Sequence, residues 1–188
     1  MAIEEIYRDY VATTGKELPE EIDVIGILRS GAIAADIMAE RLKRIPSPKI
    51  RRLFLSPRPR DGGSSLLKRE TTYNSLVSRK ILPPGTTEED FFAKPELRLF
   101  APGDNGERIG NLTEPKPQNL VLLADDCIYK GKTMGLSLQD MKKLGYNENL
   151  IYFAEYDECD EGVWHLERFP GESHPRFFGL RKVAETIK

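Results

Sequence analysis

The segment that most constrains the fold is an apolar run over residues 119–124, followed by Asp125 and Asp126 and then by a glycine-containing stretch. A continuous apolar run of this length is typical of a strand buried on both faces, as in a parallel sheet. Further along, apolar residues recur at helical spacing, at Met134, Leu138, Met141 and Leu144. The segment therefore predicts a strand over 119–124 that ends in two carboxylates, then a short loop and a helix over 134–144.

The loop between this strand and helix has the features of an anion site. The first N–H groups of a helix have no partner within the helix, and the positive end of the helix dipole favours negative charge there. Gly131 allows a phosphate to approach the backbone closely, and Thr133 adds a hydroxyl donor. A Walker A loop is excluded, because that motif needs a glycine five residues before Gly131 and Asp126 stands there.

A second segment repeats this pattern nearer the N-terminus. Asp23 and the uncharged residues 24–28 are read as a strand that runs into Arg29, Ser30 and Gly31. Helical spacing follows, with one apolar side formed by Ile33, Ile37, Met38 and Leu42. The segment predicts another strand, loop and helix, and an ordinary turn without a ligand remains the alternative for its loop.

The order of elements along the chain predicts an α/β fold. Strands are expected over residues 23–29, 50–55, 119–124 and 149–155, and helices over 31–44 and 134–144, after an amphipathic N-terminal helix closed by Gly15. Alternation of strands and helices favours a parallel sheet with helices on its faces. Ligands of such sheets bind at the carboxyl ends of the strands, where both glycine loops lie.

The residues of the strand, loop and helix around Asp125 resemble a known family. The acid pair, four further residues, Gly131, one residue and Thr133 are similar to the phosphoribosyl-diphosphate signature of type I phosphoribosyltransferases. The resemblance implies a single domain over residues 1–188 with a Rossmann-like parallel sheet, flanking helices, a small hood and a flexible loop. The two strand-loop units resemble those of small phosphoribosyltransferase-like proteins, and the loops give no clear match to the hypoxanthine-guanine, adenine, uracil or orotate enzymes.

The resemblance also implies roles for the loop residues. As catalytic residues, Asp125 and Asp126 would hold the ribose hydroxyls, although solvated charges at a strand end are the alternative. The 5′-phosphate would be bound by the second loop, formed by Tyr129, Lys130, Gly131, Lys132 and Thr133. The pyrophosphate would be bound by the first loop, formed by Arg29, Ser30 and Gly31. The cofactor implied is Mg²⁺, held mainly through the substrate and not by a direct protein ligand.

Residues 56–118 are the least regular part of the sequence. Proline, glycine and serine favour a flexible loop at its start, and a hairpin is expected with arms at 97–100 and 108–109 around a turn at 103–106. By the resemblance, the loop would bring a basic or hydroxyl-bearing side chain to the diphosphate. The candidates are Arg58 and Arg60, with Lys68, Arg69 and Tyr73 also open, and a surface loop without this role is the alternative.

The acceptor is expected to bind in the hood formed by residues 156–188. Trp164 is the candidate for stacking on a base, whereas Phe177 and Phe178 are more simply interpreted as core residues. The function implied is transfer of ribose 5-phosphate from phosphoribosyl diphosphate to a nitrogenous base, with release of pyrophosphate. A non-catalytic nucleotide sensor of the same fold is the second hypothesis, and a phosphate-binding α/β protein of another class is the third.

Composition limits the partners. The net charge is −2, so nothing in the whole chain favours nucleic acid, although residues 41–60 are basic and lack acids. No apolar run reaches membrane-spanning length, and the acidic N-terminus does not resemble a signal peptide, so a cytoplasmic protein is expected. The two cysteines form neither a disulfide framework nor a zinc motif. A homodimer remains open.

Overall fold

The computed structural model describes the larger part of the 188-residue chain. The described residues are 15, 19–28, 31–43, 48–58, 73–104, 109–128, 132–146, 150–157, 164–167 and 176–178. Of these, residue 41, residues 126–128, residue 132 and all residues from 150 onward are described by their backbone alone. No helix within these ranges is long and apolar enough to cross a membrane.

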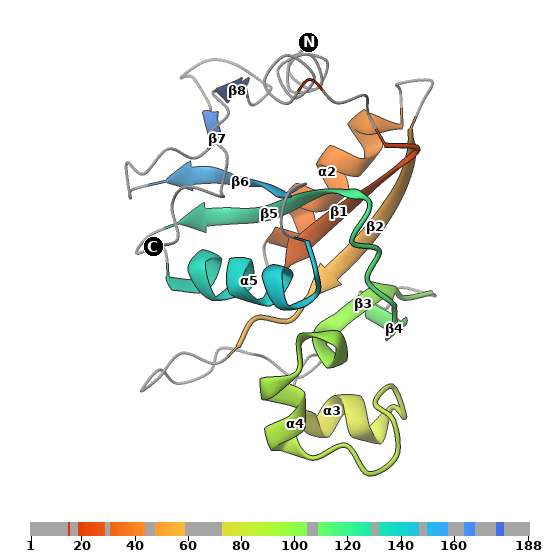
Figure 1. Ribbon diagram of the computed structural model, residues 1–188. Coiled ribbons are helices and arrows are strands. Elements are labelled where there is room, and N and C mark those ends of the chain that lie inside the picture. The colour runs from red at the N-terminus through yellow and green to blue at the C-terminus, as the bar shows by residue number, and fades with distance from the viewer. Residues whose placement is uncertain are drawn as a thin grey trace.

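A single mixed sheet organises the described residues, and Figure 1 shows helices packed beside it. Its strands are β1 (Glu21–Ile27), β2 (Lys49–Leu55), β3 (Leu99–Pro102), β4 (Ile109–Leu112), β5 (Leu120–Ile128), β6 (Leu150–Asp157), β7 (Trp164–Glu167) and β8 (Arg176–Phe178). The helices are α2 (Gly31–Leu42), α3 (Tyr73–Ser78), α4 (Glu88–Ala93), the 3₁₀ turn η1 (Pro95–Arg98) and α5 (Lys132–Lys143). The chain therefore has an α/β fold.

The strand order is β4-β3-β2-β1-β5-β6-β7-β8. Strand β1 lies at the centre and pairs in parallel with β2 and β5, and β5 pairs in parallel with β6. The pairs β2–β3, β3–β4 and β7–β8 are antiparallel, so antiparallel strands close both ends of a parallel centre. The predicted parallel sheet is confirmed for the four central strands, each within a few residues of its expected position.

The two faces of the central strands are buried by different elements. Alternate side chains of β1 and β5, including Ile25 and Val121, form one apolar cluster with the inner side of α5. A second cluster joins Phe54 and Ala32 to buried side chains of α3, α4 and the β3–β4 hairpin, such as Phe91. Burial on both faces explains why these strands are continuous apolar runs in the sequence.

The buried face of α2 differs from the predicted one. Ile33 and Ile37 are 55% and 42% exposed, whereas Ala35 and Ala39 are almost completely buried beside Met38. Small side chains face the sheet because α2 lies so close to β1 that a Cβ at Gly26 would be 2.9 Å from the Cβ of Ala35. The predicted apolar side of this helix is therefore wrong for its two isoleucines.

The strand that carries the acid pair is longer than predicted. The sequence predicts a strand end at Ala124, but β5 continues to Ile128, and Asp125 and Asp126 lie within it. Pairing with β1 stops at Ala124, while pairing with β6 continues as far as Ile128 opposite Asp157. The prediction is wrong because the ladder with β6 holds these polar residues in extended backbone despite their low strand propensity.

The hairpin predicted between residues 96 and 111 is confirmed as β3 and β4, with its first arm shifted towards the C-terminus. Helices α3 and α4, which precede it, were not predicted. Both are six residues long, too short for a periodic pattern to be visible. The one local signal is the capping box of α4, in which the Asp90 N–H donates to Thr87 Oγ1 at 3.1 Å.

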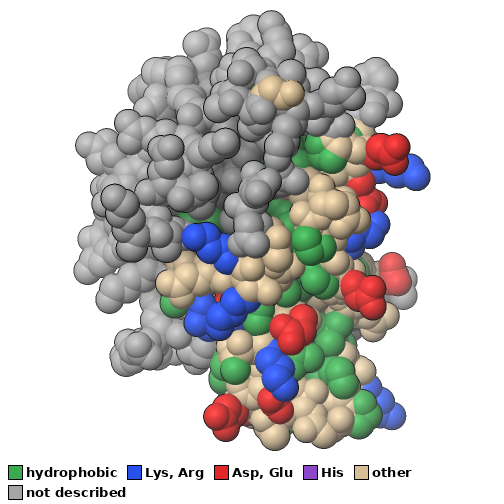
Figure 2. All heavy atoms as spheres, in the orientation of Figure 1, with side chains coloured by type: hydrophobic (Ala, Val, Ile, Leu, Met, Phe, Trp, Pro, Cys, Tyr) green, Lys and Arg blue, Asp and Glu red, His purple; other side chains and the backbone are tan. Residues whose placement is uncertain are grey.

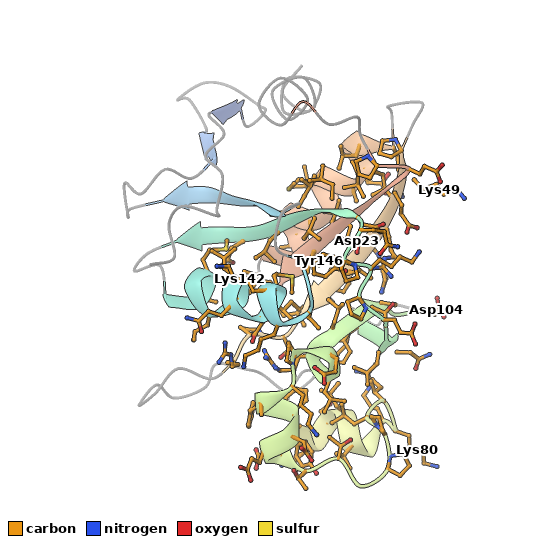
Figure 3. All side chains as sticks on the ribbon, in the orientation of Figure 1. Asp23, Lys49, Lys80, Asp104, Lys142 and Tyr146 are labelled. Atoms are coloured by element: carbon orange, nitrogen blue, oxygen red, sulfur yellow. The ribbon has the colours of Figure 1, made fainter. Side chains whose placement is uncertain are left out.

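A buried polar network joins the amino-terminal parts of three central strands. The carboxylate of Asp23 is fully buried and accepts hydrogen bonds from Arg51, Asn119 and Tyr146, the last two at 2.8 Å. The Tyr146 hydroxyl also accepts from the backbone N–H of Lys116 at 2.7 Å. Figure 3 shows the side chains of Asp23 and Tyr146 lying close together. Burial, together with the nearby Asp23 carboxylate, raises the pKa of Tyr146 above its ordinary value.

We predict that replacing Tyr146 by Phe destabilises the protein. The change removes one donor from the buried Asp23 carboxylate and one acceptor from the Lys116 N–H, so the free energy of unfolding should fall by about 1–3 kcal/mol. Urea denaturation measures this loss. Tyr73→Phe is the control, because its hydroxyl makes a single hydrogen bond, to Thr86 O. An equal or smaller loss for Tyr146→Phe would contradict the account of the network.

Candidate functional site

Two neighbouring strands of the sheet, β1 and β5, each lead from their carboxyl ends into a helix. Strands β1 and β5 are neighbours, paired from Ile22 opposite Leu120 to Gly26 opposite Ala124. The connection from β1 leads to α2 and that from β5 leads to α5 (Figure 1). The two glycine loops singled out in the sequence therefore leave adjacent strands at the same edge, although about one hundred residues separate them along the chain.

The start of α2 packs directly against the backbone of Ala124 and Asp125 in β5. A Cβ built on Gly31 would lie 2.4 Å from the carbonyl oxygen of Ala124 and 2.9 Å from the Cα of Asp125. Only glycine allows this approach without a shift of the backbone. The structure thus brings Gly31 and Asp125, both predicted site residues, into one place.

Glycine also brings the same helix end against β1. A Cβ built on Gly26 would lie 2.6 Å from the carbonyl oxygen of Gly31 and 2.7 Å from the Cα of Ala32. The first residues of α2 therefore pack closely against the end of β1 and against β5 at Ala124 and Asp125. Close packing at these two glycines fixes where the free N–H groups of the helix lie relative to Asp125.

The electrostatics of this edge favour a negatively charged ligand near the helices. Neither α2 nor α5 carries an acidic residue in its first turn, so no acid of that turn neutralises the positive end of either helix dipole. Thr133, in the first turn of α5, is half-buried, and Asp125 is only 7% exposed. The start of α2 therefore lies against the strand segment that carries the buried Asp125, an arrangement that suits a ligand with both anionic groups and hydroxyls.

Several predicted site residues lie outside the described residues, namely Arg29, Ser30, Arg60, Tyr129, Lys130 and Gly131. Three others are described by their backbone alone. Asp126 continues β5, Lys132 is the first residue of α5, and Trp164 begins β7 opposite Phe153 of β6. The roles expected for all of these residues stay predictions.

Arg58, a predicted ligand of the diphosphate, has partners within the protein. Its Nε lies 3.0 Å from a carboxylate oxygen of Asp140, and its Nη2 donates to the Leu136 carbonyl at 3.3 Å and to Gln139 at 3.2 Å. All three partners belong to α5. Asp140 also pairs with Arg98 at 2.8 Å, and both of these side chains are fully buried.

This second charged cluster, formed by Arg58, Arg98 and Asp140 together with the Ser56 carbonyl, was not predicted. It joins the chain that leaves β2, the 3₁₀ turn η1 and helix α5, and Arg98 also donates to the Ser56 carbonyl at 2.9 Å. Asp140 stands near the carboxyl end of α5, where the helix dipole disfavours an acid, so the guanidinium groups supply the compensating charge. The sequence signal for this cluster was Asp140 itself, because it is an acid at a core-facing position of α5.

Tyr73, another open candidate, lies in the region of α3 and α4. Its hydroxyl donates to the Thr86 carbonyl at 2.7 Å, and its ring packs against Phe91 with centroids 6.2 Å apart. A shallow pocket beside it is lined mainly by apolar residues between Val77 and Thr87. Figure 2 shows charges of both signs on this lower part of the molecule and basic side chains nearer α5.

No group of three His, Cys, Asp or Glu side chains within the described residues is arranged to hold a metal ion. In comparisons with known proteins, no family model matches the chain and no curated protein matches it. The resemblance to the phosphoribosyltransferases therefore stays a prediction that rests on the residues of the two loops.

We predict opposite effects for alanine at two helix glycines. Gly31→Ala should destabilise the protein by about 1–3 kcal/mol, because the new Cβ overlaps the backbone of Ala124 and Asp125. Gly135→Ala is the control, since a Cβ there meets nothing within 4 Å, and it should stabilise α5 by about 0.5–1 kcal/mol. Thermal unfolding measures both changes. A neutral Gly31→Ala would show that the close contact is not required.

We also predict that the charge of Asp140 is essential to the second cluster. Asp140→Asn leaves the buried Arg98 without a counter-charge, so the free energy of unfolding should fall by about 3–5 kcal/mol. Ser137→Ala, one turn away on the same helix, should be nearly neutral, because its buried hydroxyl has no hydrogen-bond partner among the described residues. Chemical denaturation of both variants tests the prediction, which fails if the two losses are similar.

Proposed function

We propose that the protein is a phosphoribosyltransferase, which transfers ribose 5-phosphate from phosphoribosyl diphosphate to a nitrogenous base. The observation that carries the proposal is the contact of Gly31 with the backbone of Asp125, which brings the start of α2 against the strand that carries the acid pair. The sequence signature around Asp125 and Thr133 supports the same substrate. The type I phosphoribosyltransferase fold is part of this proposal.

Each part of the donor has a chemically suitable partner at this edge. Carboxylates accept hydrogen bonds from hydroxyls, so Asp125 and Asp126 would hold the ribose diol. The 5′-phosphate would bind at the start of α5, where Thr133 adds a hydroxyl to the free N–H groups. The diphosphate would bind at the start of α2, where Gly31 leaves the backbone accessible. The ribose would thus bridge two helix ends.

The reaction proposed is a displacement at the anomeric carbon of the ribose. A nitrogen of the base forms a bond to this carbon while the bond to the diphosphate oxygen breaks, and the electron pair leaves with the pyrophosphate. When bound, Mg²⁺ would neutralise the charge of the leaving group, and oxygen ligands such as carboxylates suit it. The protein's own contribution would be to hold the 5′-phosphate, the ribose and the diphosphate of the donor and to align the ribose with the base.

The first test is binding of the donor. We expect calorimetry with phosphoribosyl diphosphate and Mg²⁺ to give saturable binding. Asp125→Asn should weaken this binding about 10- to 100-fold, the range for a lost hydrogen bond to a charged group. Asp104→Asn is the control, because Asp104 is exposed and lies beyond β3, away from the carboxyl edge. Unchanged affinity in Asp125→Asn would contradict the role of Asp125.

The second test separates an enzyme from a sensor. Wild-type protein that binds the donor should release pyrophosphate when the right base is present, which a coupled assay over a panel of purines and pyrimidines detects. Binding without release for every base would favour the non-catalytic nucleotide sensor. The absence of any donor binding would overturn both functions.

A further inference from the structure

Arg58 stands where β2 leaves the carboxyl edge of the sheet, three residues after the end of that strand. Its guanidinium makes two hydrogen bonds and one ion pair, and all three go to the second and third turns of α5, at Leu136, Gln139 and Asp140. The side chain is 22% exposed, so it lies at the rim of the charged cluster. Arg58 therefore ties the chain after β2 to the helix that starts at the predicted phosphate loop.

The ion pair of Arg58 is not needed to neutralise Asp140. Arg98 already contacts this carboxylate at 2.8 Å, and both side chains are completely buried. Removing Arg58 consequently leaves no buried carboxylate without a cation, unlike removal of Arg98. The guanidinium of Arg58 is thus the second cation of the cluster, and it contacts three residues of α5.

The contact with Leu136 lies close to the predicted phosphate site. Leu136 follows Thr133 by three residues, which is less than one turn of an α-helix. A helix held at Leu136, Gln139 and Asp140 has its first turn fixed relative to the sheet. The position of the free N–H groups in that turn decides how well they meet a phosphate.

We propose that Arg58 is a positioning residue for the 5′-phosphate end of the site, which acts by holding α5, and that it is not a ligand of the diphosphate. This inference rests on the proposed function and replaces the role that the family resemblance implies for Arg58. A guanidinium with two hydrogen bonds and one ion pair to α5 gives up those contacts if it turns to another anion. The geometry favours the anchored role.

The test compares two separate probes, ribose 5-phosphate and magnesium pyrophosphate, on the full chain. In Arg58→Met, the affinity for ribose 5-phosphate should fall about five-fold, comparable to one lost hydrogen bond, and that for pyrophosphate should stay unchanged. Arg58→Lys should not restore the affinity, because an ammonium lacks the planar fork that reaches several acceptors. Arg52→Met is the matched control, since Arg52 lies on β2, just before Arg58 in the chain, and pairs with Asp36 of α2 at 3.0 Å.

Each outcome decides between roles. Loss of pyrophosphate affinity with unchanged ribose 5-phosphate affinity would overturn the inference in favour of direct contact with the diphosphate. Unchanged affinity for both probes, or full rescue by Arg58→Lys, would overturn it as well. Wild-type protein that binds neither probe would overturn the proposed function. Hydrogen exchange of the α5 amides then decides whether Arg58 anchors the helix, because exchange should be faster in Arg58→Met than in Arg52→Met.

Discussion

The approach of α2 to the central strands is the constraint on which the rest of the site depends. Two glycines, Gly26 and Gly31, remove the side chains that would separate the start of this helix from β1 and β5. Alanines on the same helix face continue the close packing towards its carboxyl end. The positive end of a helix is thereby placed against the backbone of Asp125, a buried acid of β5.

Charged networks hold the two ends of the parallel strands. At the amino ends, Asp23 receives hydrogen bonds from Arg51 of β2, Asn119 beside β5 and Tyr146 after α5. Towards the carboxyl ends, Asp140 of α5 pairs with guanidiniums from η1 and from the chain after β2. Both networks attach α5 or the chain just after it to the sheet. The helix that begins at the predicted phosphate loop is thus fixed at two places.

Local sequence patterns predicted the central strands and helices and placed Asp125 and Gly31 at the same edge of the sheet. These features could be predicted because a buried parallel strand is a short apolar run and a Gly loop is a short motif. The same patterns misplaced the end of β5, since pairing with a partner strand decides it. They also misassigned Ile33, because the distance between α2 and the sheet selects small residues. The partners of Arg58 could not be predicted, since the ion pair joins residues about eighty positions apart.

The central claim is that one ligand bridges the starts of α2 and α5. Nuclear magnetic resonance of the labelled protein tests it most directly, by following the backbone amides of Gly31 and Thr133 as phosphoribosyl diphosphate and Mg²⁺ are added. If one ligand bridges the two helix starts, both amide signals shift and both titrations give the same dissociation constant, with a much smaller shift at Gly110 of the edge strand β4. A shift at only one of the two helix starts, or different constants for the two, would contradict it.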